Sequence, residues 1–269
     1  MLTWKVLSQM TPRLTANYHT HTPRCQHARG TEREFIEAAI ANGIKTLGFA
    51  DHSPQLLKNG FVSGIRMLPE QLPGYVDTLV KLREEYKDKI EILIGLEAEY
   101  YPDIFDDLIG YISQFPIDYL IMGQHYLFDE STSPYVSLPN DSEDSLADYA
   151  DQLCEGMRTG KFAYVAHPDL KNYVGPNEIY EKHMSKICLT AKELDIPLEI
   201  NVLGLWQKRI YPSEKFWRLA GEIGNTAIIG CDAHSPEAIY LSEFIDGCFE
   251  IAEKYGVKLT ESIRMTMKK

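Results

Sequence analysis

Short apolar runs alternate with longer amphipathic stretches along the chain, and this alternation constrains the fold more than any other feature. Seven strand-like runs occur at residues 14–19, 45–50, 90–96, 118–123, 162–166, 197–202 and 226–231. Strands that are separated by helical stretches predict a parallel sheet with helices outside it, and near-continuous apolar strands indicate burial on both faces. We therefore predict an α/β fold with one domain over residues 14–269, preceded by an N-terminal extension at residues 1–13.

The intervening stretches contain recognisable helix ends. Thr31 and Glu34 have the spacing of a capping box, and Ser235-Pro236 predicts an N-cap for a helix that runs to about residue 255. Apolar residues at helical intervals predict further helices over 70–86, 145–158, 176–194 and 212–223. Residues 53–68 and 127–144 are too long for simple turns, and we expect the second to cover a functional site.

Composition excludes several classes of function. The net charge of −12 argues against nucleic-acid binding, which needs clustered Lys and Arg. No run of eighteen apolar residues is present, so we expect no membrane span. The five cysteines are odd in number and have no Cys-x-x-Cys spacing, which favours a reducing compartment. We predict a cytoplasmic protein.

Almost every predicted strand ends at a residue that can bind a metal ion. These residues are His19, His21, Asp51, His52, Glu97, His125, His167, Asp232 and His234, and His27 follows the first pair closely. Carboxyl ends of parallel strands converge on one edge of a fold, so together they predict a multinuclear metal site. Mixed His and carboxylate ligands suit Zn, Mn or Fe. Singly, each histidine is better explained as a core group bonded to a carbonyl. We expect His183, inside a helix, to be an ordinary helix residue.

The same residues form a series of motifs. They are His19-Thr-His21, Cys25-x-His27-Ala-x-Gly30, Asp51-His52-Ser-Pro54, Gly95-Leu-Glu97, Gly123-x-His125, His167 and Gly230-x-Asp232-Ala-His234. The series resembles the PHP (polymerase and histidinol phosphatase) superfamily, and within it the single-domain histidinol-phosphate phosphatases of the HisK type. This resemblance implies a distorted seven-stranded (β/α) TIM-like barrel with three divalent metal ions, usually Zn, Mn or Fe.

The resemblance also implies which residues bind each ion. The first ion is expected on His19, His21, Glu97 and Asp232. The second is expected on Glu97, His125 and His167, with Glu97 as the bridge. The third is expected on His27, His52 and His234.

The implied activity is hydrolysis of a small-molecule phosphate monoester. The expected substrate is L-histidinol phosphate, which a metal-bound hydroxide would convert to L-histidinol and phosphate in histidine biosynthesis. Arg66, Arg209 and Arg29 are candidates for binding the phosphate, because an arginine fork pairs bidentately with its oxygens. Arg209 and Asp51 are the catalytic candidates. Asp51 either orients a ligand imidazole or assists the leaving group, and the first role is favoured because neighbouring strand residues face opposite ways.

Neighbouring residues have weaker assignments. Glu99 is as easily solvent-facing as functional, and Cys25 is best explained as an incidental thiol. Trp206 and Tyr101 are candidates for the wall of an imidazole pocket. Candidates for binding the substrate amine are Asp129, Glu130 and Asp169.

Three alternatives to a histidinol-phosphate phosphatase stay open. The first is a PHP phosphoesterase for phosphotyrosine or a nucleotide. The second is an amidohydrolase-type deaminase, which shares the barrel and the His-x-His start. The third is an inactive, metal-stabilised binding domain. The oligomeric state is also left open.

Overall fold

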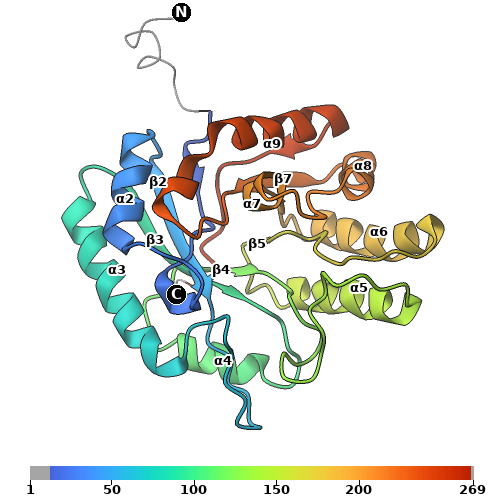
Figure 1. The fold of residues 1–269 in the computed structure, drawn as a ribbon, viewed down its shortest axis with the longest axis horizontal. Helices are drawn as coiled ribbons and strands as arrows, with labels where there is room; N and C mark the ends of the chain where they lie inside the picture. Colours follow the sequence, from blue (N-terminus) through green and yellow to red (C-terminus); the bar gives the residue numbers. More distant parts are fainter. Residues whose placement is uncertain (1–12, 268–269) are drawn as a thin grey trace, which may run out of the picture.

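A parallel sheet of eight strands, paired in the order of the chain, forms the centre of the computed structural model, which describes residues 13–267 (Figure 1). The strands are β1 Ala16–Asn17, β2 Thr46–His52, β3 Glu91–Ala98, β4 Tyr119–Met122, β5 Tyr164–Val165, β6 Leu198–Asn201, β7 Thr226–Gly230 and β8 Lys258–Leu259. The first seven confirm the predicted runs. The eighth was not predicted, because Lys258 and Leu259 lie in a mixed polar stretch and not in an apolar run. All but one residue of the predicted extension at residues 1–13 lie outside the described residues.

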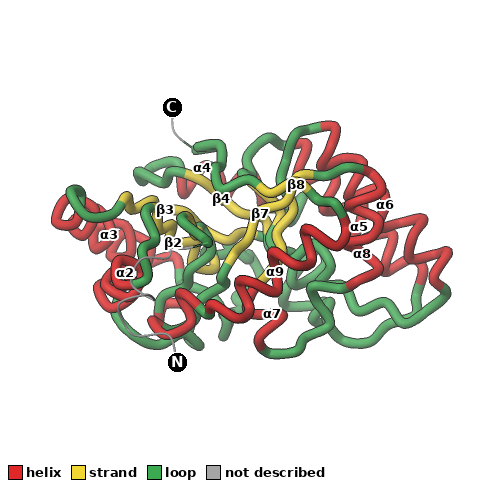
Figure 2. The backbone as a smooth tube through the Cα atoms, turned by 90° about the horizontal axis from the view of Figure 1, so that it is seen from above, coloured by secondary structure: helices red, strands yellow, loops and turns green. Residues whose placement is uncertain are grey.

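Helices alternate with the strands, and the longer ones cover the outer side of the sheet (Figures 1 and 2). They are α2 Glu32–Ala41, α3 Leu72–Tyr86, α4 Phe105–Ile112, α5 Glu143–Arg158, α6 Asn177–Glu193, α7 Val202–Trp206, α8 Glu214–Ile223 and α9 Ser242–Tyr255. The capping box is confirmed, since Thr31 and Glu34 each accept from the other's main-chain N–H. Helices α4 and α7 had no predicted range.

The prediction of one helix from Pro236 to residue 255 was wrong. Residues Pro236–Tyr240 form a 3₁₀ helix, and the side chain of Ser235 makes no capping bond. The α-helix begins only at Ser242, because Leu241 leaves the helical region with a ψ of 85°.

A small apolar cluster fills the inside of the curved sheet, separate from the larger core between sheet and helices. It contains Tyr18, Tyr119 and Tyr164, and Ile263 and Met265 of the C-terminal segment pack against it. This segment is also tied to the amino-terminal side of the sheet, because Tyr18 Oη donates to the carbonyl of Glu261 at 2.7 Å. One end of the barrel is therefore filled by the chain itself.

At the other end of the barrel, contacts just beyond β1 and β7 join the first and seventh strands. Thr20 and Ala233 form a parallel bridge, and the His21 N–H donates to the Ala233 carbonyl at 2.9 Å. The fold is a distorted (β/α) barrel, as expected, with one more strand than predicted.

Two further expectations concern the environment of the protein. Within residues 13–267, no helix is both long and apolar enough to cross a membrane. All five cysteines are free and buried. The cytoplasmic location stays a prediction from the sequence.

Glycine at position 95 is required by the packing of Tyr119 inside the barrel. A Cβ at Gly95 would lie 2.4–2.7 Å from three atoms of the Tyr119 ring. The ring cannot easily move away, because its hydroxyl donates to the Tyr18 carbonyl at 2.7 Å. We predict that Gly95→Ala lowers the free energy of unfolding by about 1–3 kcal/mol, the usual cost of overpacking a core.

Urea denaturation at a fixed metal concentration measures this effect. Gly110→Ala in α4 is the matched control, because no atom from outside its own stretch of helix backbone lies within 4 Å of its Cβ position. It should leave stability unchanged or raise it by up to about 1 kcal/mol, since alanine favours helix. Equal stabilities for the two variants would contradict the packing argument.

Candidate metal centre

The carboxyl ends of six strands bring nine potential ligands to one end of the barrel. His52 ends β2 and is the register partner of Glu97 on β3, so these two side chains are neighbours. The others are His19 and His21 after β1, His27 further along the same connection, His125 after β4, His167 after β5, and Asp232 and His234 after β7. The convergence that the sequence predicted is confirmed.

Two of these residues have a left-handed backbone. The φ angles are 31° at His167 and 51° at Asp232. Residues other than glycine adopt this region at a cost in free energy, and such strain clusters at functional sites. The turns after β5 and β7 thus aim these two side chains into the site.

Glu97 lies at the middle of the group and is almost fully buried. Five imidazoles have a ring nitrogen within 3.6 Å of its carboxylate: His19, His21, His52, His125 and His167. Burial would raise the pKa of this carboxyl, but His52 and the other histidines hold it well below its usual range. Glu97 is therefore ionised, with its two oxygens directed towards different rings.

One set of four ligand atoms surrounds the place expected for the first ion. His21 Nε2 lies 3.0 Å from Asp232 Oδ1 and 3.6 Å from Glu97 Oε2, and His19 Nε2 lies 3.5 Å from the same two oxygens. Two ligands on one tetrahedral ion with bonds of about 2.0–2.1 Å are about 3.3 Å apart. The buried Nε2 atoms of both histidines and Oε2 of Glu97 have no hydrogen-bond partner. The set fits a metal ion.

The charge around His21 also favours a cation at this place. Burial lowers the pKa of His21, but the neighbouring carboxylates of Asp232 and Asp51 raise it well above the usual value. A site that holds a proton so strongly attracts positive charge, and a divalent ion satisfies the same carboxylates.

The place expected for the third ion is assembled, whereas around the second the closest groups of three are His52, Glu97 and His125, and His19, His167 and Asp232. His167 Nε2 lies 2.9 Å and His125 Nε2 3.6 Å from Glu97 Oε1. His27 Nε2 and His234 Nε2 face each other at 2.9 Å, with a nitrogen of His52 close by.

Two of the three histidines around the third place are neutral and therefore suited to binding a metal. Burial lowers the pKa of His52 to about 4. Burial and the neighbouring His21 hold the pKa of His234 well below its usual value. Neutral imidazole is the form that binds metal ions, so these rings need no deprotonation.

Three of the imidazoles each have a buried carboxylate of their own behind the ring. Glu199 Oε1 contacts His19 Nδ1 at 2.8 Å, and Glu99 Oε1 contacts His125 Nδ1 at 3.0 Å. Asp51 Oδ1 lies 3.5 Å from His21 Nδ1. Carboxylates in such positions fix the tautomer and tilt of a ligand imidazole.

The structure corrects the assignment of Asp51 as a catalytic group. It is fully buried, and its oxygens accept from the Thr22 hydroxyl and from the main-chain N–H groups of Thr22 and His52. It does not line the cavity, so its place is that of an orienting partner for His21. Of the two possibilities left open for Glu99, the structure excludes the solvent-facing one, because Glu99 is 1% exposed.

Sequence reasoning missed the position of Glu199 behind His19. Its second oxygen accepts from the His167 main-chain N–H at 3.0 Å, so one carboxylate orients two site residues. The signal in the sequence that could have revealed Glu199 was an acidic residue within the apolar run that forms β6. Glycines make room for the site carboxylates, since a Cβ at Gly230 would lie 1.8 Å from Glu199 Oε1 and one at Gly123 would lie 1.8 Å from Glu97 Oε1.

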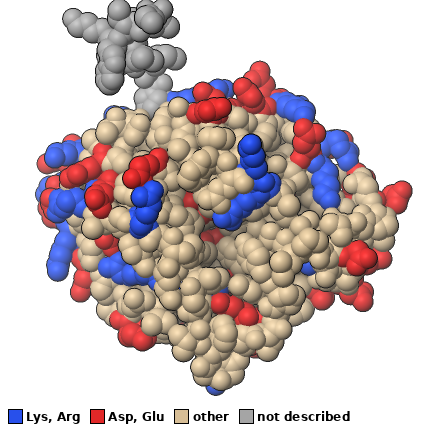
Figure 3. Space-filling view, in the orientation of Figure 1, with Lys and Arg blue, Asp and Glu red and all other residues tan. Residues whose placement is uncertain are grey.

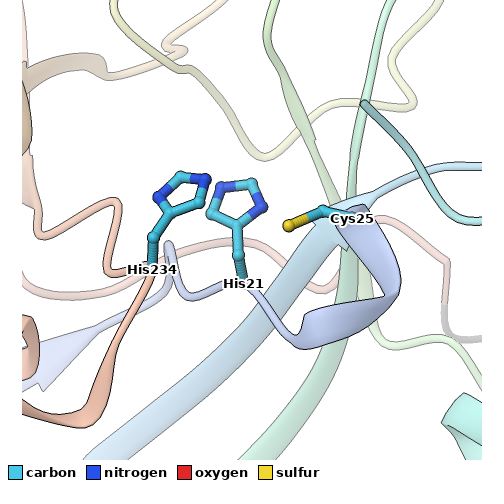
Figure 4. A group of neighbouring side chains, drawn as sticks. All are labelled: His21, Cys25 and His234. Atoms are coloured by element: carbon cyan, nitrogen blue, oxygen red, sulfur yellow. The ribbon is translucent and has the colours of Figure 1, made fainter. Parts of the chain in front are cut away.

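Cys25 lies closer to the site than expected. Its thiol points towards the His21 ring, and His234 stacks on that ring at 4.1 Å (Figure 4). The thiol also contacts His27, and although burial opposes this, the two histidines lower the pKa of Cys25. Its sulfur is within 4.8 Å of ring nitrogens of His21 and His234.

A cavity of about 500 Å³ opens over the ligands. Besides seven of the nine candidate ligands, its lining consists of Ile65, Tyr126, Tyr135, Leu203, Gln207, Arg209 and Tyr211. In Figure 3 the charged side chains lie mostly towards the edge of the view, and the face is hollowed near its centre. Arg209 is the one cationic side chain among the described lining residues, and it donates to the Tyr211 hydroxyl at 2.8 Å.

Two other arginines do not reach the cavity. Arg66 is 1% exposed and directs its guanidinium to Glu99 and Glu130, so the expectation that it binds phosphate was wrong. The side chain of Arg29 is 75% exposed and pairs with Glu237 at 3.3 Å, away from the lining. The positions of these two arginines in the sequence did not reveal that both guanidinium groups already pair with carboxylates.

The weaker candidates for substrate contact also lie elsewhere. The cavity lining does not include Trp206, Tyr101, Asp129, Glu130 or Asp169. Tyr101 is buried, and Asp169 accepts from the main-chain N–H of Ser213 at 2.6 Å, which supports the start of α8. His183, as expected, is an ordinary helix residue that contacts Glu143 at 3.1 Å.

Comparison with known proteins places this geometry in a family. The model of the PHP domain matches residues 17–203. A protein of Deinococcus radiodurans named "Probable histidinol-phosphatase" is 31% identical over 255 residues, covering 90% of this chain and 94% of the relative. A second protein of that name, from Schizosaccharomyces pombe, is 24% identical and covers 86% of this chain and 85% of its own length.

A solved structure has a similar fold. It is the histidinol phosphate phosphatase of Lactococcus lactis, complexed with zinc, L-histidinol and phosphate, with a TM-score of 0.74 and 20% identity over 94% of this chain and 98% of that one. The matched family model covers β1 to α7 and includes seven of the nine candidate ligands. The chain belongs to the PHP domain family.

Proposed function

We propose that the protein is a metal-dependent phosphomonoesterase that hydrolyses L-histidinol phosphate to L-histidinol and phosphate. The observation that carries the proposal is the two-sided cavity. One side consists of imidazoles and carboxylates with unbonded buried atoms, and the other consists of an arginine and tyrosines. A phosphate ester needs this combination, because its phosphate is anionic and its leaving group is an organic alcohol.

We assign three divalent ions, Zn, Mn or Fe, to the three ligand sets described above. The first set is His19, His21, Glu97 and Asp232, the second is Glu97, His125 and His167, and the third is His27, His52 and His234. When bound, such ions neutralise the phosphate oxygens and lower the pKa of water so that hydroxide is available near neutral pH.

Arg209 binds the phosphate oxygens that face away from the ligands. Its guanidinium is fixed by Gln207 Oε1, at 2.9 and 2.7 Å, and by the Tyr211 hydroxyl. An arginine held in this way offers a preorganised cation to the transition state, in which negative charge is spread over the phosphoryl oxygens.

The aromatic side of the cavity suits the organic part of the substrate. Tyr126, Tyr135 and Tyr211 line it, and the Tyr135 ring lies parallel to that of His125 within 9°. Tyrosine rings stack on an imidazole and attract an ammonium group through their faces. Histidinol phosphate has both groups, and the names of the two relatives support the same substrate.

Steady-state kinetics of phosphate release tests the substrate. L-Histidinol phosphate should have a higher kcat/KM than phosphotyrosine, a nucleoside monophosphate or p-nitrophenyl phosphate. Among these compounds it alone offers both an imidazole and an amine to the tyrosine side of the cavity. If p-nitrophenyl phosphate were an equally good substrate, the phosphomonoesterase activity would stand and the assigned substrate would be wrong.

Removal of a first-ion ligand tests the metal centre. Protein purified without chelator should contain about three divalent ions per chain by mass spectrometry, since each ion needs at least three protein ligands. His21→Ala should lose turnover and metal while its far-UV circular dichroism stays that of the wild type, because one ligand contributes little to the barrel core. A content near one ion per chain would contradict the assignment, and a collapsed spectrum would indicate a structural metal.

Replacement of Arg209 tests phosphate binding. A hydrogen bond to a charged group contributes about 1.5–3 kcal/mol, so Arg209→Ala should lower kcat/KM roughly 10- to 150-fold. Arg29→Ala is the matched control and should behave as the wild type, because its guanidinium pairs with Glu237 at the surface. Equal losses in both variants would show a general charge effect instead of a specific contact.

A further inference from the structure

Two connections that both line the cavity meet in a buried ionic cluster next to His125. Arg66 comes from the connection between β2 and α3, and Glu130 from the connection between β4 and α5. Glu99 follows β3 directly. All three side chains are at most 4% exposed.

Arg66 uses its whole fork within this cluster. Nη1 and Nη2 donate to the two oxygens of Glu99, both at 2.8 Å, and Nε donates to Glu130 Oε2 at 2.6 Å. Gln55 Nε2 donates to Glu99 at 3.1 Å, and the Ser63 hydroxyl donates to Glu130 at 2.6 Å. The carboxylate of Glu99 therefore cannot rotate without breaking several bonds.

The fixed carboxylate contacts one side of the His125 ring. Glu99 Oε1 lies 3.0 Å from Nδ1, whereas Nε2 on the other side lies 3.6 Å from Glu97 Oε1. An ionised carboxylate accepts only, so Nδ1 carries the proton and Nε2 presents its lone pair. Apolar residues of similar volume commonly serve stability as well as a buried ion pair does. The contact with His125 gives the cluster a specific purpose.

We propose that Glu99, clamped by Arg66, is a positioning residue that sets the metal affinity of the place formed by Glu97, His125 and His167. The inference rests on the metal centre of the proposed function. Glu99 differs from Glu199 and Asp51 because a guanidinium from a connecting segment holds it. The packing of the β2–α3 and β4–α5 connections is therefore linked to the orientation of the His125 ring.

Zinc-binding isotherms at buffered free zinc concentrations test the proposal on the full chain. Glu99→Gln keeps the shape of the side chain and removes its charge. We expect one class of zinc site to weaken about 10- to 100-fold, the usual effect of losing such a partner, while the other sites keep their affinity. Glu143→Gln is the matched control, since Glu143 contacts His183 in a carboxylate–histidine pair outside the site. It should bind zinc as the wild type does.

Arg66→Lys provides a second variant if Glu99→Gln does not fold. Lysine keeps the charge but lacks the fork, so the same class of site should weaken by a smaller factor. Unchanged zinc isotherms in a folded variant would overturn the proposal, as would equal weakening of every site, because a structural role acts on the whole protein. If the wild type itself bound no zinc, manganese or iron, the proposed metal centre would be wrong instead.

Discussion

The burial of many ionisable groups at one end of the barrel is the constraint on which the structure depends. Glu97 is 1% exposed and faces five imidazoles, and the burial of such groups without partners is costly. Carboxylates behind the rings offset part of this cost from the protein side, at Glu199, Glu99 and Asp51. Metal ions between the rings would offset the rest. The same arrangement therefore explains both the local stability and the proposed chemistry.

The two ends of the barrel have different tasks. At the carboxyl ends of the strands, left-handed backbone at His167 and Asp232 and glycine at position 230 make room for converging polar groups. At the opposite end, apolar side chains and the C-terminal segment fill the interior, with Met265 packed against it. Strain and charge at one end can persist because packing at the other end holds the strands in register.

The connecting segments supply what the strands cannot. The strands present ligands in a fixed geometry, whereas Arg209 and the tyrosines that shape the cavity come from segments between elements. Substitutions in these segments can therefore change which alcohol is accepted without moving the ligands. The buried contact of Arg66 with Glu99 is a place where a segment reaches back to the ligand set.

The sequence by itself determined the seven principal strands, the parallel α/β class and the convergence of nine candidate ligands, because strand ends such as His52 and His167 are local features of an alternating pattern. Tertiary structure alone decided the partners of the remaining charges. Arg66 and Arg209 look alike in sequence, yet one is enclosed between carboxylates and the other lines the cavity. Glu199 likewise gained its role only through His19, which is 180 residues away along the chain. Contacts between distant segments set the position of a long polar side chain, and local spacing contains no information about them.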